Sequence, residues 1–355
     1  MSYFDEFGNL STNSKVPGIP GYPMNRVFAP VAVAGQVGLE LEVEGDPLPT
    51  SVPGTITCPK TKARWAVKQD GSLRGGMEYV MSKPCDLEGV EPMVAELFNY
   101  FNDFGSKLRP SNRCSTHVHL NVSDWTIDKI TSFLVVWSIV EPAIIDWCGL
   151  DRKSNHFCLG ITDTTTSIEA WNNFLSNGAT AFPEGAKYSA CNIRHLNDFG
   201  SIEIRCGRAP EDVTEITTFT KFLWGVRQFA DRHNNPADIP GILSDGDVFG
   251  IFFEICRDMG IEDFFEEVRA ACPDYEKLGR KSYYETRRLC HIYPWNEWMG
   301  EISKPYIVNP FSSSAGKAVP FRARPAEPGF RPDTPEEALD ALTATRPDAV
   351  RLRMR

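Results

Sequence analysis

The sequence predicts an α+β protein, in which an antiparallel sheet carries polar side chains on one face and helices cover the other. Two observations lead to this fold class. Short segments that alternate apolar and polar residues recur through residues 38–206, and such alternation indicates strands with one buried face. After residue 213 the apolar residues recur at helical spacing, which predicts a mostly helical C-terminal half.

The composition is that of a globular protein. The chain has 355 residues, 42% hydrophobic and 24% charged, which suits one elaborated domain. A net charge of −10 argues against general binding of nucleic-acid backbones. The ten cysteines form no C-x-x-C pair, and no secretory segment starts the chain, so we expect reduced, passive thiols and a cytoplasmic protein. The longest apolar run, 133–145, is interrupted by polar residues and is too short to span a membrane.

The first predicted strand spans residues 38–44 and reads G-L-E-L-E-V-E. Its apolar residues alternate with Glu40, Glu42 and Glu44, so three carboxylates share one face. Residues two apart on a strand lie about 7 Å from each other, so three ionised carboxylates repel one another. A face open to water is one explanation. The other is a row of oxygen ligands for Mg²⁺ or Mn²⁺, which would in turn hold the phosphates of a nucleotide.

Two further strands form a predicted hairpin. Residues 64–69 alternate as a strand and end in the turn signature D-G-S at 70–72. Residues 75–80 then form the returning strand. The hairpin places Asp70 at its tip and Glu78 on a strand.

A helix and another polar strand come next. Apolar residues recur at helical spacing through residues 86–105, and the final glycine is a candidate C-cap. Residues 113–122 alternate as a strand whose polar face carries His117 and His119. Residues 123–148 read as a long apolar helix, capped by its first or second residue.

The middle of the chain is rich in loops. Residues 151–186 contain one short predicted helix, and loops of this length near a site often act as lids or substrate collars. The segment K-Y-S-A-C-N at 187–192 leads to a third polar strand at 201–206, with Glu203 and Arg205 on one face. A surface ion pair between these two residues is the simple alternative, worth about 0 to 1 kcal/mol.

The two ends of the chain differ from this core. Residues 1–30 lack periodicity and predict an extended arm, followed by a single domain over 31–302. Residues 303–355 predict a linker that ends in a short helix with a capping box and a small basic tip. Amphipathic patterns predict helices at 213–232, 247–258, 262–271 and 282–292.

Five pieces of the sequence, in order, resemble the amidoligases of the glutamine synthetase-like, carboxylate-amine ligase superfamily, especially the phage and bacterial group. The resemblance runs from about residue 36 to residue 210. Glutamine synthetases carry a similar H-V-H strand and a similar E-x-R strand. The pieces are G-L-E-L-E at 38–42, D-G-S at 70–72 with Glu78, S-T-H-V-H at 115–119, K-Y-S-A-C-N at 187–192 and S-I-E-I-R at 201–205.

The resemblance implies a curved antiparallel sheet that forms a half-barrel, with helices packed on its outer side. It also implies an ATP- and Mg²⁺-dependent ligase, which joins a carboxylate to an amine through an acyl phosphate. Because Ser2 follows Met1, we expect no N-terminal cysteine nucleophile that would release ammonia from glutamine. The amine would be free or come from a partner.

The resemblance also implies roles for individual residues. Arg205 would stabilise the transferring phosphoryl group, because a planar guanidinium binds phosphate oxygens bidentately. Asp70 would accept a proton from the attacking amine, and Lys187 would contact phosphate or the acid substrate. Contacts to the nucleotide are expected from His119, Asn192, Arg194 and Arg205. The metal ligands would be Glu40, Glu42, Glu78, His117 and Glu203.

Two other functions remain open. A metal-dependent hydrolase would use the same carboxylates and histidines, although Arg205 and Lys187 nearby favour a phosphate ligand. A non-catalytic structural or assembly protein on the same fold is the third hypothesis, suggested by the arm and the tail. Dependence on a nucleotide separates the ligase from both.

Overall fold

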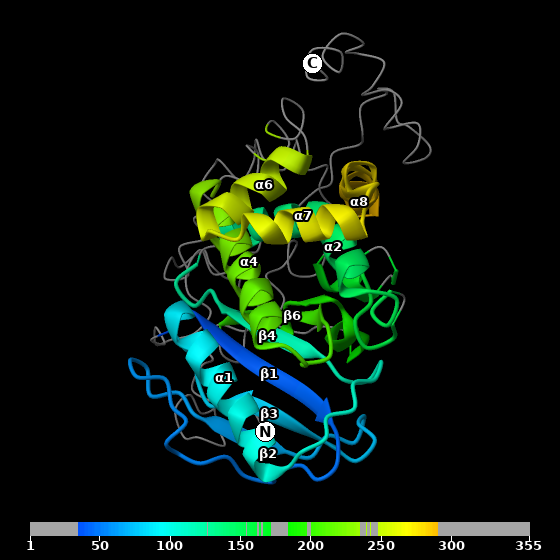
Figure 1. The fold of residues 1–355 in the computed structure, drawn as a ribbon. Coiled ribbons are helices and arrows are strands. Elements are labelled where there is room, and N and C mark those ends of the chain that lie inside the picture. The colour runs from blue at the N-terminus through cyan, green and yellow to red at the C-terminus, as the bar shows by residue number, and fades with distance from the viewer. Residues whose placement is uncertain are drawn as a thin grey trace, which may run out of the picture.

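The structure, a computed structural model, describes residues 35–289 except for 126, 154, 162, 165, 172–183, 197–199, 235–238, 240–241 and 243–247. The predicted arm at 1–30 and the predicted linker and tail at 303–355 lie outside these residues. The rest is an α+β protein, as predicted, with a layer of helices packed on an open antiparallel sheet (Figure 1).

The sheet has six strands in the order β2-β3-β1-β4-β6-β5, and every neighbouring pair is antiparallel. The strand 38–44 predicted from alternation is therefore central and has a partner on each side. A two-residue strand joins the edge beyond the predicted strands. The strands are β1 (Val37–Glu44), β2 (Trp65–Lys68), β3 (Gly76–Met81), β4 (Thr116–Asn121), β5 (Cys191–Asn192) and β6 (Ser201–Gly207).

The helices cover one face of the sheet and extend beyond it. In Figure 1, α1 lies across β1 and β3, while α4 and α2 pack against β4 and β6 and carry the remaining helices above them. Two short 3₁₀ segments, η3 (Glu184–Tyr188) and η4 (Arg194–Leu196), flank β5. The helices are α1 (Leu87–Phe104), α2 (Ile127–Cys148), α4 (Val213–Arg232), α6 (Val248–Met259), α7 (Glu262–Ala271) and α8 (Tyr275–Leu289).

The apolar face of the sheet and the inner faces of the helices share one hydrophobic core. Leu39 and Leu41 of β1 are fully buried in it, as their alternation with glutamates predicts. The indole of Trp65 donates a hydrogen bond to the carbonyl of Met93, which joins β2 to α1. Gly105 ends α1 at a φ of 76°, so the predicted C-cap is confirmed.

The predicted start of the helix at 282–292 is wrong, because α8 (Tyr275–Leu289) begins seven residues earlier, while 290–292 lie outside the described residues. Gly279 would ordinarily weaken a helix in this region. Here it permits close packing, since a Cβ at that position would lie 2.6 Å from the carbonyl oxygen of Ile139 in α2. The glycine that disfavours a helix in the sequence is the residue that lets α8 pack on α2.

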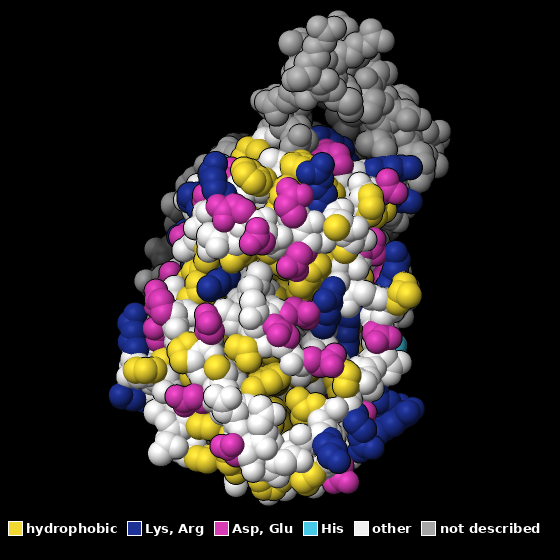
Figure 2. Space-filling model, in the orientation of Figure 1, with side chains coloured by type: hydrophobic (Ala, Val, Ile, Leu, Met, Phe, Trp, Pro, Cys, Tyr) yellow, Lys and Arg dark blue, Asp and Glu magenta, His cyan; other side chains and the backbone are white. Residues whose placement is uncertain are grey.

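The apolar helix α2 is longer than the run measured in the sequence. Residues Lys129–Cys148 have the length and composition of a membrane span, but 83% of that window is buried inside the protein. α2 packs against α8, α4 and α7, which explains its apolar character on all sides. Figure 2 shows acidic and basic side chains interspersed over the helical side of the molecule, in the orientation of Figure 1.

Candidate metal centre

Three neighbouring strands bring their polar side chains to one face of the sheet. In the register of β1, β4 and β6, Glu40 lies opposite His117, and His119 lies opposite Glu203. Residues directly opposite each other in an antiparallel pair project from the same face. The predicted shared face of Glu40, His117 and Glu203 is therefore confirmed.

These three side chains form a compact cluster with the geometry of a metal site. The ligand atoms of Glu40, His117 and Glu203 all lie within 4.8 Å of one another. His117 Nδ1 is 3.4 Å from a Glu40 oxygen and 3.2 Å from a Glu203 oxygen. Two ligands of one ion, each about 2.1 Å from it at angles of 90 to 110°, are about 3.0 to 3.4 Å apart. The cluster therefore fits a divalent ion with little rearrangement.

Two more imidazoles surround the same carboxylates. His119 Nε2 lies 3.1 Å from Glu40 Oε1 and 4.0 Å from Glu203 Oε1, while its Nδ1 is 3.1 Å from the Ser201 hydroxyl. His119, expected to contact the nucleotide, is thus placed among the metal-ligating groups. His195 of η4 lies 3.2 Å from the second oxygen of Glu203. Sequence reasoning missed His195, because only the packing of η4 on β6 brings it to Glu203.

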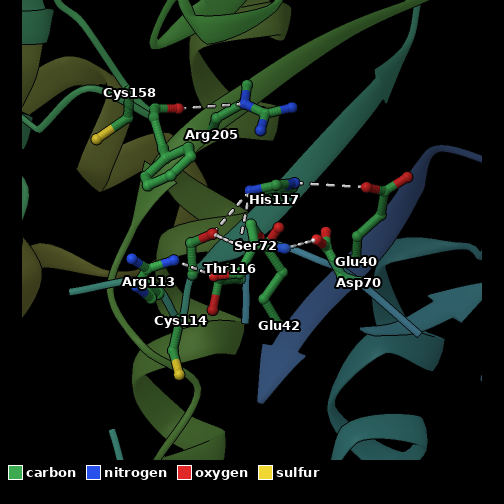
Figure 3. A network of polar contacts seen from close by, with 12 residues as sticks. Glu40, Glu42, Asp70, Ser72, Arg113, Cys114, Thr116, His117, Cys158 and Arg205 are labelled. Atoms are coloured by element: carbon green, nitrogen blue, oxygen red, sulfur yellow. Dashed lines mark hydrogen bonds and ion pairs between the residues drawn. The ribbon is translucent and has the colours of Figure 1, made fainter. Parts of the chain in front are cut away.

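A β-bulge brings Arg205 to this cluster. The register between β4 and β6 shifts by one residue, so that Arg205 and Cys206 together lie opposite His117. The guanidinium Nη1 of Arg205 is 3.0 Å from Glu203 Oε1, and its Nε donates to the Phe157 carbonyl at 3.4 Å. Arg205 and His117 are both labelled in the close-up of this polar network in Figure 3. The ion pair between Glu203 and Arg205, which was the simple alternative in the sequence, is present, but the side chains are only 1% and 17% exposed, so it is not a surface ion pair.

Glu42 lies behind His117 rather than in the compact cluster. The Ser115 hydroxyl donates to Glu42 and is 2.7 Å from His117 Nε2, which itself lies 3.5 Å from Glu42 (Figure 3). One nitrogen of His117 thus faces Glu40 and Glu203, and the other faces Glu42. Such partners fix the orientation of a ligating histidine. Among the described residues, the three-membered cluster does not include Glu42, which was predicted as a ligand.

Glu78, the fifth predicted ligand, lies opposite Glu42 in the sheet register. Burial, and next the nearby Glu40 carboxylate, raise the pKa of Glu78 to about 9. A neutral Glu78 beside an ionised Glu40 limits the repulsion that the row of carboxylates would otherwise cause. Glu44 has a different role, since its Oε1 accepts the Arg74 N–H at 2.7 Å and fixes the loop between β2 and β3.

Charges within the cluster balance one another. Burial by itself would lower the pKa of the His117 imidazole, but the neighbouring carboxylates, Glu42 first, outweigh it and raise the pKa to about 10. Burial likewise opposes ionisation of Glu203, but Arg205 and the histidines hold its pKa well below the usual range. The pKa of Glu40 is also held well below its usual range, because His119 and His117 outweigh its burial. A protonated His117 therefore supplies positive charge between these carboxylates, and it would release that proton on binding a metal.

The other predicted site residues lie on β5, in the two 3₁₀ segments beside it and in the loop between β2 and β3. Asn192 Nδ2 donates to Glu203 at 2.6 Å, and its Oδ1 accepts the backbone N–H of Arg194. Asp70 accepts the Ser72 N–H at 2.6 Å, which is the contact of a turn-forming residue. The ammonium of Lys187 lies 4.9 Å from the ring centre of Tyr188. The roles proposed for Asp70, Lys187 and Arg194 stay predictions.

Most of the described thiols agree with the expectation of passive cysteines, and Cys58 differs. Burial raises the pKa of Cys114 and of Cys191, and a hydrogen bond with Cys148 together with burial raises that of Cys206, as expected for inert core thiols. Cys58 contradicts the expectation. Burial and Asp86 oppose ionisation of its thiol, but contacts from Cys85 and Thr61 outweigh them and lower its pKa.

No protein-family model matches this chain, and no curated protein is significantly similar to it.

Proposed function

We propose that this protein is a metal-dependent enzyme of phosphoryl transfer, an ATP-dependent carboxylate-amine ligase that forms an amide through an acyl phosphate. The observation that carries the proposal is the cluster of Glu40, His117 and Glu203 on one sheet face, with Arg205 paired to Glu203. Carboxylates, an imidazole and an arginine are the groups that phosphoryl transfer between anions requires.

In this proposal Glu40, His117 and Glu203 hold a divalent ion, whose charge offsets that of the nucleotide phosphates. Asn192 donates to Glu203 and fixes the carboxylate, while Ser115 fixes the imidazole of His117. Buried supporting hydrogen bonds of this kind hold ligands in place before the ion binds.

Arg205 acts on the transferring phosphoryl group. The two contacts of its guanidinium, to Glu203 and to the Phe157 carbonyl, use two of the five N–H donors that an arginine carries. They orient the planar fork at the edge of the cluster. A fork held in this way stabilises charge that develops on the phosphoryl oxygens, so its contribution is larger in the transition state than in the ground state. The substrates would be a carboxylic acid and an amine, with ammonia either free or supplied by a partner.

The test is ADP release with Mg²⁺ or Mn²⁺, measured with candidate acids and amines beside thermal denaturation. Arg205→Ala is expected to keep most metal–ATP binding and to lose turnover. Arg208→Ala is the matched control, because Arg208 lies three residues further on and pairs with Glu215, outside the cluster. A wild-type protein indifferent to metal–ATP in both measurements rules out the ligase.

One observation favours a metal-dependent hydrolase as the second candidate. Three imidazoles, of His117, His119 and His195, lie within 4.0 Å of Glu40 or Glu203 oxygens. Imidazole ligands suit Zn²⁺ better than Mg²⁺. Cleavage of ester or amide substrates with Zn²⁺ or Mn²⁺, unchanged by ATP, would establish this alternative.

A further inference from the structure

A second cluster of metal-ligating side chains lies at the start of α1, within the hydrophobic core. Cys58 comes from the loop between β1 and β2, and Cys85 and Asp86 immediately precede the helix. Both cysteines are fully buried and Asp86 is only 8% exposed. The Cys58 thiol therefore meets a thiol and a carboxylate from a distant part of the chain, at a place that is largely shielded from solvent.

The three groups are close enough to share one ion. Their ligand atoms all lie within 4.8 Å of one another. The Cys58 thiol donates to Asp86 Oδ1 at 3.0 Å, and the backbone N–H of Thr61 lies 3.5 Å from the Cys58 sulfur. In a tetrahedral site with sulfur at about 2.3 Å from the metal, two sulfurs are about 3.8 Å apart. Small shifts of these side chains would produce that geometry.

Gly89 makes room for the cluster. A Cβ on Gly89 would lie 2.6 Å from the Cys85 sulfur, 3.1 Å from the Cys58 sulfur and 3.4 Å from Asp86 Oδ1. The three potential ligands thus converge above one glycine in the first turn of α1. Glycine lowers helix stability by about 1 kcal/mol relative to alanine, so this position gives up helix propensity where the two sulfurs need space.

We propose that Cys58, Cys85 and Asp86 bind a thiophilic divalent ion of the Zn²⁺ class, which ties the loop between β1 and β2 to the start of α1. On binding, each thiol releases its proton to solvent and the two sulfurs coordinate as thiolates, with Asp86 already ionised. The site then carries one net negative charge, which the N-terminal end of the α1 dipole stabilises. The fourth position is left to water or to the exposed Glu88 in the same turn.

Electrostatics at the cluster agree with this assignment. The Cys58 thiol, by donating to Asp86, holds the pKa of that carboxyl below its usual value. The pKa of Cys58 is lowered as well, whereas burial raises that of Cys85.

The test is a titration of the reduced, chelator-treated full chain with Cd²⁺, followed by sulfur-to-metal charge-transfer absorption in the ultraviolet. This band reports thiolate ligands only, so an ion at Glu40, His117 and Glu203 contributes nothing to it. We expect a saturating amplitude equal to one thiolate-bound Cd²⁺ per chain and a raised melting temperature. Cys58→Ser and Cys85→Ser should each abolish the band, while Cys256→Ser, in α6, should keep it.

Two further variants keep the test decisive if a serine variant does not fold. Gly89→Ala retains both cysteines and favours the helix. Its methyl group would displace the Cys85 sulfur, so the band should be lost. Asp86→Asn should keep the band and bind Cd²⁺ at least about 10-fold more weakly. A reduced wild-type protein without the band, or a folded Gly89→Ala protein that keeps it at full strength, overturns the proposal.

Discussion

Glu40 and Glu44 lie on the same face of β1, yet their surroundings differ. Glu40 contacts His117 and His119, whereas Glu44 accepts a backbone N–H from Arg74. Glu40 therefore belongs to the metal cluster, whereas Glu44, four residues further on, holds a loop. Alternation in the sequence cannot separate these two roles.

The first prediction follows from this contrast. Glu40→Gln removes a ligand charge from the cluster, so we expect Mn²⁺ affinity to fall at least about 10-fold. Glu44→Gln is the matched control, because the amide oxygen can still accept the Arg74 N–H and the cluster is untouched. Isothermal titration of both variants with Mn²⁺ measures the difference. Equal affinity in the two proteins would remove Glu40 from the site.

Glu141 is a buried carboxylate outside the metal cluster. It is 3% exposed, and its two oxygens accept the Trp137 indole N–H and the Ile161 backbone N–H, each at 2.7 Å. Burial raises its pKa to about 7, although both of these hydrogen bonds act in the opposite direction. The folded protein therefore binds a proton here that the unfolded chain releases at lower pH.

The second prediction is a pH dependence of stability. Because the pKa of Glu141 is higher in the folded state, its favourable contribution is complete below about pH 4.5 and is lost as the pH rises to about 7, by about 3 kcal/mol in total. Glu141→Gln should remove this contribution to the slope and leave those of Glu78 and His117, whose pKa values are also raised in the folded protein. The measurement is urea unfolding at several pH values between 4.5 and 8, with Glu96→Gln on the exposed side of α1 as control. Parallel profiles for wild type and Glu141→Gln would contradict it.

At the scale of elements, Arg227 joins α4 to the end of β4. Its Nε donates to the Asn121 carbonyl at 2.9 Å and its Nη2 to Asp124 at 3.0 Å. The guanidinium also lies between two indoles, with its carbon 4.6 Å from the Trp125 ring centre and 4.4 Å from that of Trp224. The covering helix is thereby fixed to a strand that carries two histidines of the site.

The third prediction is that Arg227→Lys lowers the free energy of unfolding by about 1 to 3 kcal/mol, because an ammonium cannot stack between both rings and keep the planar hydrogen bonds. Arg232→Lys should change it by less than about 1 kcal/mol, since Arg232 is 43% exposed and forms surface ion pairs. Chemical denaturation of both variants gives the comparison. A cost for Arg227→Lys no larger than that of the control would show that the stacking contributes little.

At the scale of the whole molecule, ligand binding should stabilise the fold. If the cluster assembles only in the folded chain, metal–ATP at about 100 times its Kd should add roughly 2.7 kcal/mol to the free energy of unfolding. The fourth prediction is therefore that metal–ATP raises the melting temperature. EDTA should remove this increase, and ATP without metal should not produce it. A Glu203→Gln protein should show little of the shift. An equal shift in that variant would place the nucleotide elsewhere.

The sequence by itself determined every strand of the described sheet except β5, together with their polar faces and the α+β class, because period-two alternation and helical spacing are local properties of the chain. It also singled out Glu40, His117, Glu203 and Arg205, whose residue types carry metal and phosphate chemistry.

Only the tertiary structure decided which of those residues meet. The pairing of β1 with β4 places Glu40 opposite His117 but does not extend to Glu44. The packing of η4 on β6 brings His195 next to Glu203. The close approach of α8 to α2 at Gly279, and the meeting of Cys58 with Cys85, join segments far apart in the chain. Such contacts depend on strand pairing and packing over long sequence separations, which no local pattern of residues encodes.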